Sequence, residues 1–466
     1  MMDTRSISNP VLIGLRLTGI WPGFPHEIIV RLIWVVDLAS AQIFQYRYVL
    51  KHLSLDTLTD FVDSVGTSLP YSLLCFKLIS FWTNRGIFRN ILLRMSHDWT
   101  YSVAAKHNVD VMINKSVLAY QCSKLIMAIY AIAVFVYASV FLELGDQSQD
   151  GGFNRTSREL LMKMDLPFAY YDSPIYEYVF VVQFVQLLST AFAIAMLDAL
   201  IISLIFHIGG QIEMLHNDIA NVSVKNEEFE VLRIQIKSLI NRHYRIIINA
   251  EYVESLFSYI ALIQLFCNTL VICSVGFIII VAINSHGDIK VFIKISFFYI
   301  AITTEAFIFS FAGEYLSNKS LSINNSAYDS LWYLLKPRDR RALVLLMIRS
   351  QRPLTITAGK FMDLSLEGFA NNRPCEGSES SQVPLMRPRT VMSQVEGCLY
   401  PHCQRPLISL APKPPLRQAQ LSRLFKQPPP PKDAEVNIHP QHHSNQSAER
   451  PGLYNPRESQ YQSVSQ

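Results

Sequence analysis

This sequence is poor in charged residues and has no cysteines at the spacings of a disulfide framework. Asp, Glu, Lys and Arg make up only 17% of its 466 residues, half of the chain is apolar, and the mean hydropathy is positive. This composition excludes an ordinary soluble domain. We expect the cysteines to be free thiols. They occur at Cys75, Cys122, Cys267 and Cys273 in apolar segments and at Cys375, Cys398 and Cys403 near the C-terminal end.

The sequence also lacks the motifs of catalysis and of metal binding. We find no nucleophile elbow, phosphate-binding glycine loop or catalytic carboxylate pair. His207, Gln211 and His243 lie near the inner ends of two apolar segments, but no Cys, Asp or Glu completes a ligand spacing, so hydrogen bonding is their expected role. Arg16 interrupts the apolar run near the N-terminus, so we expect no signal peptide. We predict no enzymatic activity, no cofactor and no metal.

Proline and net charge are concentrated at the C-terminal end. Residues 371–466 hold 15 of the 23 prolines and 11 Lys or Arg against 7 Asp or Glu, whereas residues 1–370 carry 30 charges of each sign. The basic character therefore belongs to this end, and we infer no nucleic-acid partner from it. We predict a transmembrane domain over residues 1–369 and a Pro-rich, low-complexity, disordered tail over residues 370–466.

Six apolar segments are long enough to cross a lipid bilayer as helices. A crossing needs about 20 largely uncharged residues, because every backbone polar group must be satisfied within the segment. Residues 125–142, 178–197 and 255–287 meet this test. Three weaker segments contain an internal ion such as Asp37, Lys77 or Glu305, and they cover residues 32–50, 58–82 and 292–312. The spacing predicts an all-α polytopic membrane helical bundle. Asp198 and Glu305 are ions within apolar runs, so we expect them to face the bundle interior or water.

Basic residues in the connecting segments predict the orientation of the bundle. They gather in residues 84–118, 208–250 and 313–341, whereas the loop over residues 143–175 is acidic. This alternation predicts a cytoplasmic N-terminus, which conflicts with a G-protein-coupled receptor. Asn154 lies in the predicted outer loop and is a glycosylation candidate. Apolar residues at helical spacing after the fourth span predict that spans four and five continue into the cytoplasm as a packed helical platform.

Six segments in order resemble the insect odorant receptor family, over about residues 11–369. They are GIWP (19–22), LPFAYYDSPIYEYVFVVQF (166–184), LDALIISLIFHIGGQIEML (197–215), LINRHYRIIINAEYVESLFSYIALIQLF (239–266), FAGEYLSNKSLSINNSAYDSLWY (311–333) and RSQRPLTITAGKFMDLSLEGF (349–369). The resemblance implies a seven-span, odorant-gated cation channel subunit in the plasma membrane of olfactory neurons. It also implies a hetero-oligomer, a tetramer with the shared odorant receptor co-receptor, whose cytoplasmic helices make the main contact between subunits.

The resemblance further implies a ligand pocket in the outer half of the bundle, for a small volatile apolar ligand. Such a pocket should be mostly aromatic and aliphatic, with a few polar groups that orient the ligand. By their depth along the spans, six aromatic side chains are candidates for its wall, although each alone is more typical of packing between helices. They are Tyr71, Tyr130, Tyr137, Phe180, Phe184 and Tyr299.

The final span raises a conflict within the sequence. Residues 353–369 read as the opening of the helix that lines the pore in the family, but they would span only about 25 Å as a helix. Lys360, Asp363 and Glu367 interrupt them, and the chain becomes polar from Asn371. Two functions therefore remain open. The chain is an odorant-binding channel subunit, or it is a non-conducting variant that assembles with or sequesters partner subunits.

Overall fold

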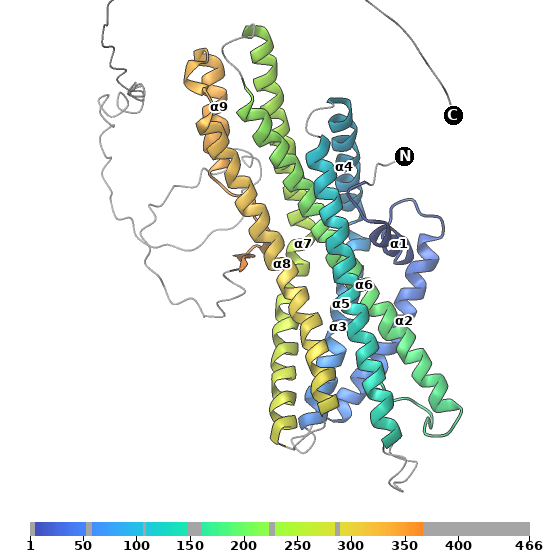
Figure 1. Cartoon of the computed structure of the whole chain (residues 1–466). Helices are drawn as coiled ribbons and strands as arrows, with labels where there is room; N and C mark the ends of the chain where they lie inside the picture. Colours follow the sequence, from blue (N-terminus) through green and yellow to red (C-terminus); the bar gives the residue numbers. More distant parts are fainter. Residues whose placement is uncertain are drawn as a thin grey trace, which may run out of the picture. The chain divides into compact units, whose positions relative to one another are not determined.

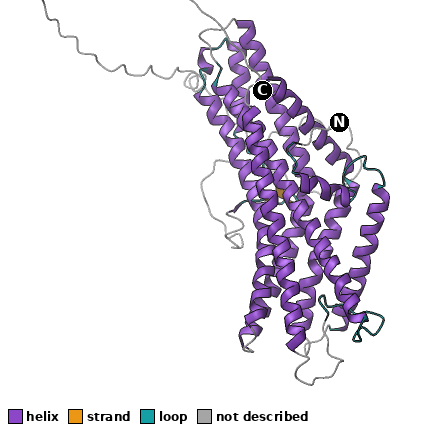
Figure 2. Cartoon of the chain, turned by 45° about the vertical axis from the view of Figure 1, so that its right-hand side comes forward, coloured by secondary structure: helices purple, strands orange, loops and turns teal. Residues whose placement is uncertain are grey.

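A computed structural model describes residues 5–52, 58–105, 109–147, 160–222, 229–284 and 289–366. Within these residues the regular structure is helical except for one short hairpin, as Figure 2 shows. The predicted tail over residues 370–466 and the predicted glycosylation site Asn154 lie outside the described residues. The predicted all-α bundle is confirmed for the part of the chain that can be described.

The first half of the chain forms five helices, labelled in Figure 1. The first begins after Ser8 with Pro10 in its first turn, where the missing amide hydrogen of proline has no intrahelical partner to lose. It ends before Gly19, which adopts a φ of 65°. The helices are α1 (Asn9–Leu17), α2 (Glu27–Lys51), α3 (Leu58–Thr83), α4 (Arg85–Ala105) and α5 (Val109–Gln147).

The second half forms three long helices, one short helix and the hairpin. The short helix begins with Pro337 and carries Asp339 in its first turn and Arg349 in its last, charges that suit the helix dipole. The elements are α6 (Ile175–Ala220), α7 (Phe229–Asn284), α8 (Ile289–Asp329), the 3₁₀ turn η3 (Trp332–Leu334), α9 (Pro337–Ser350), β1 (Thr357–Ala358) and β2 (Met362–Asp363).

Four of the described helices, α5 to α8, are long and apolar enough to cross a membrane. Helices α2 and α3 match the two weaker N-terminal segments, and with 25 and 26 residues they are long enough to cross as well. Helix α6 has 46 residues and α7 has 56, so they are about 69 and 84 Å long at 1.5 Å per residue. Both exceed twice the roughly 30 Å of a hydrocarbon core. The predicted continuation of these two helices beyond the membrane is confirmed.

Helix α6 is the centre of the bundle. Every residue from Ala193 to Ile212 is buried, because α1, α5, α7 and α8 all pack against this helix. Its sequence is mostly apolar on all sides there, as a helix surrounded by others requires. Gly209 and Gly210 let two neighbours approach closely, since a Cβ on Gly209 would lie 2.6 Å from the Tyr315 ring of α8.

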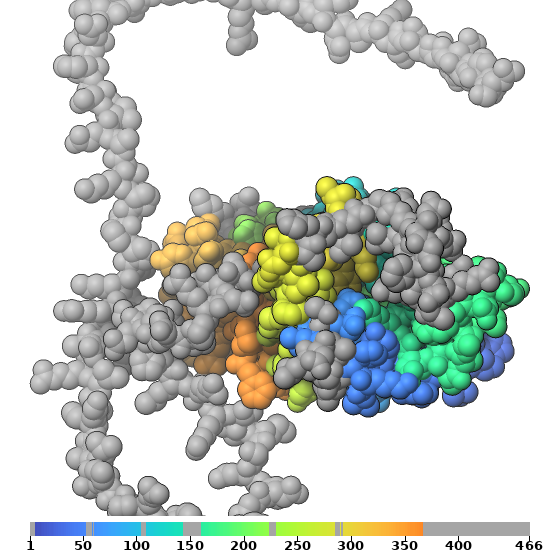
Figure 3. Space-filling model, turned by 90° about the horizontal axis from the view of Figure 1, so that it is seen from below, coloured from blue at the N-terminus to red at the C-terminus, as the bar shows by residue number. Residues whose placement is uncertain are grey.

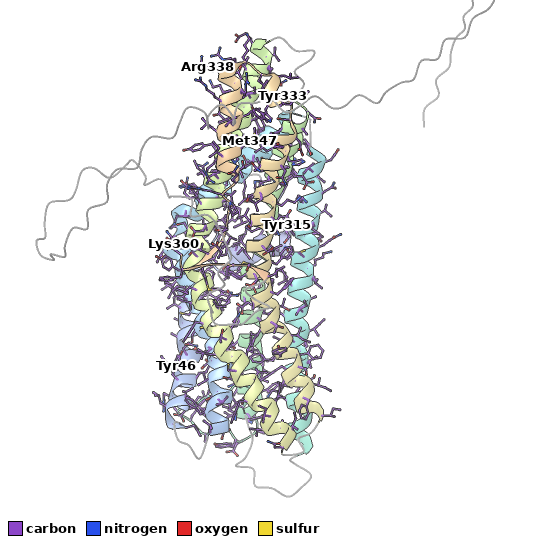
Figure 4. All side chains as sticks on the ribbon, turned by 90° about the vertical axis from the view of Figure 1, so that its left-hand side faces the viewer. Tyr46, Tyr315, Tyr333, Arg338, Met347 and Lys360 are labelled. Carbon is purple, nitrogen blue, oxygen red and sulfur yellow. The ribbon has the colours of Figure 1, made fainter. Side chains whose placement is uncertain are left out.

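The ends of the long helices gather at opposite ends of the bundle. The end of α4, the end of α6, the start of α7, and α9 lie toward one end, and the end of α7 and the start of α8 lie at the other (Figure 1). Figure 4 shows the same separation, with Arg338 and Tyr333 toward one end and Tyr46 toward the other. Viewed from the end that carries Tyr46, α2 and α3 lie between the start of α6 and the α7–α8 pair (Figure 3).

The predicted helix opening at residues 353–369 is wrong for the residues that can be described. Thr357 and Ala358 pair antiparallel with Asp363 and Met362 around a turn in which Gly359 and Lys360 have φ values of 60° and 64°. The turn binds α7, because the Gly359 amide donates to the Ser258 carbonyl at 2.9 Å. Lys360 therefore lies partway along the bundle, at the level of Tyr315 (Figure 4). No helix crosses the membrane between residues 354 and 365.

Replacing Gly359 with alanine should loosen the hairpin. A Cβ at Gly359 would meet the Leu262 side chain at 2.6 Å and would hold an L residue at a φ of 60°, which costs about 1–2 kcal/mol before the clash is counted. We expect a lower Tm in detergent and faster tryptic cleavage at Lys360. Gly276→Ala in α7 is the control, because a Cβ there meets nothing within 4 Å. Equal cleavage rates for Gly359→Ala and the parent chain would contradict the described turn.

Candidate functional site

An internal cavity lies among α3, α5, α6, α7 and α8. The centre of a water-sized sphere can occupy about 110 Å³ of this cavity. The wall is mainly aliphatic and aromatic, and Met162 from the segment between α5 and α6 closes it. An apolar cavity with a few polar groups is the usual form of a site for a small organic ligand.

Three of the six aromatic side chains predicted from the sequence line this cavity. Tyr71 comes from α3, and Tyr130 and Tyr137 come from one face of α5, two turns apart. The Tyr71 hydroxyl donates to the Met162 sulfur at 2.9 Å, and the Tyr130 hydroxyl donates to Asp198 at 2.9 Å. The structure therefore brings these three tyrosines together, and their role in ligand binding stays a prediction.

The other three predicted side chains lie outside the cavity wall. Phe180 stacks on Phe141 with ring centroids 6.1 Å apart, and Phe184 lies 5.8 Å from Phe135, so both pack between α5 and α6. Tyr299 is 43% exposed on the outside of α8. Depth along a span was the basis of these predictions, but the rotation of each helix decides which side chains face inward.

The structure adds wall residues that sequence reasoning missed. On α6 they lie one to three turns deeper than Phe184, at Leu187, Thr190 and Ile194. On α8 the neighbour of Tyr299, Phe298, points to the cavity instead. Asn268 on α7 is the amide among these additions, and an amide in an apolar span was the signal that could have revealed it. Asn268 also borders a groove of about 100 Å³ between α7, α8 and the hairpin.

The segment before α6 covers one end of the cavity. Residues Leu160 to Met162 are buried, and Gln183 holds Met162 with hydrogen bonds of 3.2 Å to its backbone N–H and carbonyl. Lys163 lies 2.6 Å from Asp60 and 3.4 Å from Asp63 at the start of α3. Burial lowers the pKa of Lys163, but the hydrogen bond to Asp60 and the charge of Asp63 outweigh it, so the net pKa is raised. The cover is thus anchored by a charged lysine.

A buried ion cluster lies beside the cavity. The Lys77 ammonium donates to Glu305 at 2.6 Å and to Asp198 at 3.2 Å, and it lies 5.6 Å from the centre of the Phe309 ring. With Tyr130 bonded to Asp198, the cluster joins α3, α5, α6 and α8. The expectation that Asp198 and Glu305 face the bundle interior is confirmed.

A second polar cluster joins α4 to the N-terminal segment, α6 and α7. His207 contacts Ser6 at 2.9 Å and Asp98 at 3.3 Å, and Asp98 also accepts from Arg245. Burial raises the pKa of the Asp98 carboxyl, but the hydrogen bond with His207 and the charge of Arg245 more than offset it, so the net pKa is lowered. The hydrogen-bonding role expected for His207 is confirmed. Among the residues described, no three His, Cys, Asp or Glu side chains gather as metal ligands would.

Removing Lys77 should destabilise the bundle strongly. Lys77→Met leaves Asp198 and Glu305 as buried carboxylates without their cation, and breaking a buried ion pair costs about 3–5 kcal/mol. We expect a large fall in Tm and in the folded yield from detergent. Lys51→Met is the matched control, because Lys51 pairs with Asp165 at 2.6 Å but is largely exposed, so its loss should cost less than about 1 kcal/mol. Equal Tm shifts for both variants would contradict the structural role of the cluster.

Comparison with known proteins places the chain in a family. The profile described as 7tm Odorant receptor matches residues 57–372, more than half of the chain. Odorant receptor 82a of Drosophila melanogaster is 27% identical over 46% of this chain and 54% of its own length, and Odorant receptor 10 of Aedes albopictus is 27% identical over 34% and 40%. The chain thus spans about half the length, or less, of these two relatives. Odorant receptor 13a of Drosophila melanogaster is 24% identical over 78% of this chain and 92% of its own.

A solved structure shares the fold. The insect olfactory receptor OR5 from Machilis hrabei, in complex with eugenol, superposes with a TM-score of 0.60 at 15% identity, over 77% of this chain and 92% of that one. The family is one of receptors and not of enzymes, in agreement with the absence of catalytic motifs. The profile match over most of the helices and the shared bundle show that this chain is a multi-pass membrane protein of the insect odorant receptor family.

Proposed function

We propose that the chain is an odorant-binding subunit of a heteromeric ligand-gated cation channel in the plasma membrane of olfactory neurons. The observation that carries this proposal is the apolar cavity among five helices of an odorant receptor bundle. The structure of the Machilis receptor was determined with eugenol, a small aromatic compound, which supports the same class of ligand here. The partner would be the odorant receptor co-receptor, in a tetramer.

The cavity wall supports a small volatile ligand with few polar atoms. Burial of apolar ligand surface contributes roughly 25 cal/mol per Å² to the binding free energy. The aliphatic and aromatic wall offers few groups for polar interactions with a ligand. Among the six side chains predicted from the sequence, we assign ligand contact to Tyr71, Tyr130 and Tyr137, which line the cavity. Ligand contact by Phe180, Phe184 and Tyr299 stays a prediction.

We further propose that the N-terminus and α9 are cytoplasmic. The positive-inside rule supports this orientation, because the basic segments 84–118, 208–250 and 313–341 gather toward one end of the bundle. The N-terminal segment belongs to that part of the bundle, since Ser6 contacts both His207 and Trp99. The acidic segment over residues 143–175, with the candidate glycosylation site Asn154, would then lie outside.

Exposed apolar side chains on α7 and α9 support assembly with a partner. Ile234 and Tyr244 on α7 are 68% and 63% exposed, and Leu345 and Ile348 on α9 are 66% and 57% exposed. The start of α7 and the whole of α9 lie toward the end of the bundle that we place in the cytoplasm. We therefore place water, and not lipid, around these side chains. Exposed apolar groups in water are typical of interaction surfaces. A co-receptor subunit is the partner that the family assignment favours.

A second candidate function is a non-conducting subunit that assembles with or sequesters its partners. Residues 354–365 form the hairpin and its flanks instead of a helix, and the sequence becomes polar and Pro-rich from Asn371. A polar, Pro-rich segment is unsuited to the wall of a pore within the bilayer, because its backbone groups would lack partners there. In this alternative the subunit has the same cavity and the same packed helical platform, but it does not conduct ions.

Current measurement distinguishes the two functions. We expect co-expression with the co-receptor to give odorant-evoked current for a chimaera in which residues 370–466 are replaced by the final helix of a conducting family member. If the chain is an active subunit, its own sequence conducts as well. If it is a non-conducting variant, its own sequence is silent and lowers the current of conducting subunits expressed with it. A silent chimaera across a broad odorant panel would contradict the proposed channel function.

Assembly can be tested without current. Tyr244→Asp with Ile348→Asp places two charges on the exposed apolar face, so we expect the yield of co-receptor recovered with the tagged chain to fall about tenfold, as for a loss of about 1.4 kcal/mol. Lys237→Asp is the control, because Lys237 is an exposed polar residue on the same helix α7. Unchanged co-purification of the double variant would place the interface elsewhere on the subunit.

A further inference from the structure

One amide in the cavity wall has no hydrogen-bond partner. Asn268 is on α7 and only 5% exposed, and its Nδ2 atom is buried without a partner among the described residues. An unpaired buried amide costs about 1–3 kcal/mol relative to a paired one. Asn268 separates the cavity from the groove beside the hairpin, so it lies where a ligand in the cavity can reach it.

Four of the five hydroxyl groups of the wall are already engaged. Tyr71 and Tyr130 both donate to protein acceptors. The Thr190 hydroxyl lies beside the Tyr71 phenol but has no hydrogen-bond partner among the described residues. The remaining two donate to backbone carbonyls: Thr67 to Asp63 at 3.2 Å and Tyr137 to Leu161 at 3.4 Å. The amide hydrogens of Asn268 and the hydroxyl of Thr190 are therefore the donors in this wall that a ligand can use without breaking a described hydrogen bond.

The charge distribution excludes an acid as the ligand. Glu305 lines the cavity, whereas the ammonium of Lys77 is held between Glu305 and Asp198 and does not line it. A ligand carboxylate would lose its hydration with a protein carboxylate nearby and no cation of the wall to pair with it.

We infer that the cavity selects small neutral, mainly apolar molecules that carry one hydrogen-bond acceptor, such as a ketone, aldehyde or ester oxygen, which accepts from Asn268. The inference rests on the proposed odorant-binding function and assigns its ligand class. An apolar cavity of about 150 Å³ holds benzene, so a substituted single-ring compound would fill this cavity of about 110 Å³ and extend past Asn268 into the groove of about 100 Å³. Gaining one hydrogen bond to a buried amide is worth on the order of tenfold in affinity.

The test uses three single-ring probes of nearly equal size: acetophenone, ethylbenzene and benzoate. The full chain is purified into lipid nanodiscs, and affinity is read from the rise in Tm with probe concentration. We expect acetophenone to bind about tenfold more tightly than ethylbenzene and benzoate to bind least. In Asn268→Leu the preference for acetophenone should fall, and with Thr190→Val added it should fall to near unity. Partition of each probe into lipid is measured with protein-free nanodiscs, and affinities are referred to the free probe concentration. Where one probe is compared between parent and variant, its partition cancels.

Thr269→Val is the matched control, since Thr269 is next to Asn268 but does not line the cavity, and it should keep the tenfold preference. Equal affinities for acetophenone and ethylbenzene in the parent chain overturn the inference even if Asn268→Leu does not fold. A preference that is unchanged in Asn268→Leu, or tight binding of benzoate, also overturns it. If none of the probes raises the Tm, the cavity is not an odorant site, and the proposed function fails with the inference.

Discussion

The fold depends on the neutralisation of Lys77 inside an apolar bundle. An ammonium group at this depth is costly unless carboxylates surround it, and Asp198 and Glu305 supply them from two other helices. Tyr130 brings in a fourth helix through Asp198. Because each member would be an uncompensated polar group without the others, the cluster sets the register of α3, α5, α6 and α8 along their axes. Apolar packing specifies this register less sharply, because apolar side chains of similar volume can replace one another at small cost.

The cavity is a consequence of this arrangement. Tyr130 and Glu305 belong both to the cluster and to the cavity wall. The groups that hold the helices together are therefore also polar groups of the cavity wall. The rest of the wall is apolar and is closed by Met162, whose backbone is held by Gln183. A ligand in this position would touch five helices and the cover at once. The affinity for such a ligand would therefore change with the spacing of these helices. A difference in affinity between two arrangements is what lets a ligand shift a receptor from one to the other.

The hairpin links the cavity to the C-terminal part of the bundle. Asn268 borders both the cavity and the groove against the hairpin. The hairpin itself is held by the Gly359 amide on Ser258 and by the Thr357 hydroxyl, which lies 2.7 Å from Glu254. Sequence reasoning read these residues as a helix because they carry the apolar residues of a family motif. Positive φ at Gly359 and the bonds to α7 decide otherwise, and neither can be read from apolar spacing.

The sequence by itself determined the long apolar helices, the membrane bundle, the family and the burial of Asp198 and Glu305, because these follow from hydropathy, charge placement and motif order along the chain. The tertiary structure alone decided which side chains face the cavity. Tyr71, Tyr130 and Tyr137 do, whereas Phe180, Phe184 and Tyr299 at similar depths do not. It also decided that Lys77 meets both carboxylates and that Asn268 is left without a partner. The reason is that depth along a helix follows from residue number, but the rotation of each helix is set by how its neighbours pack.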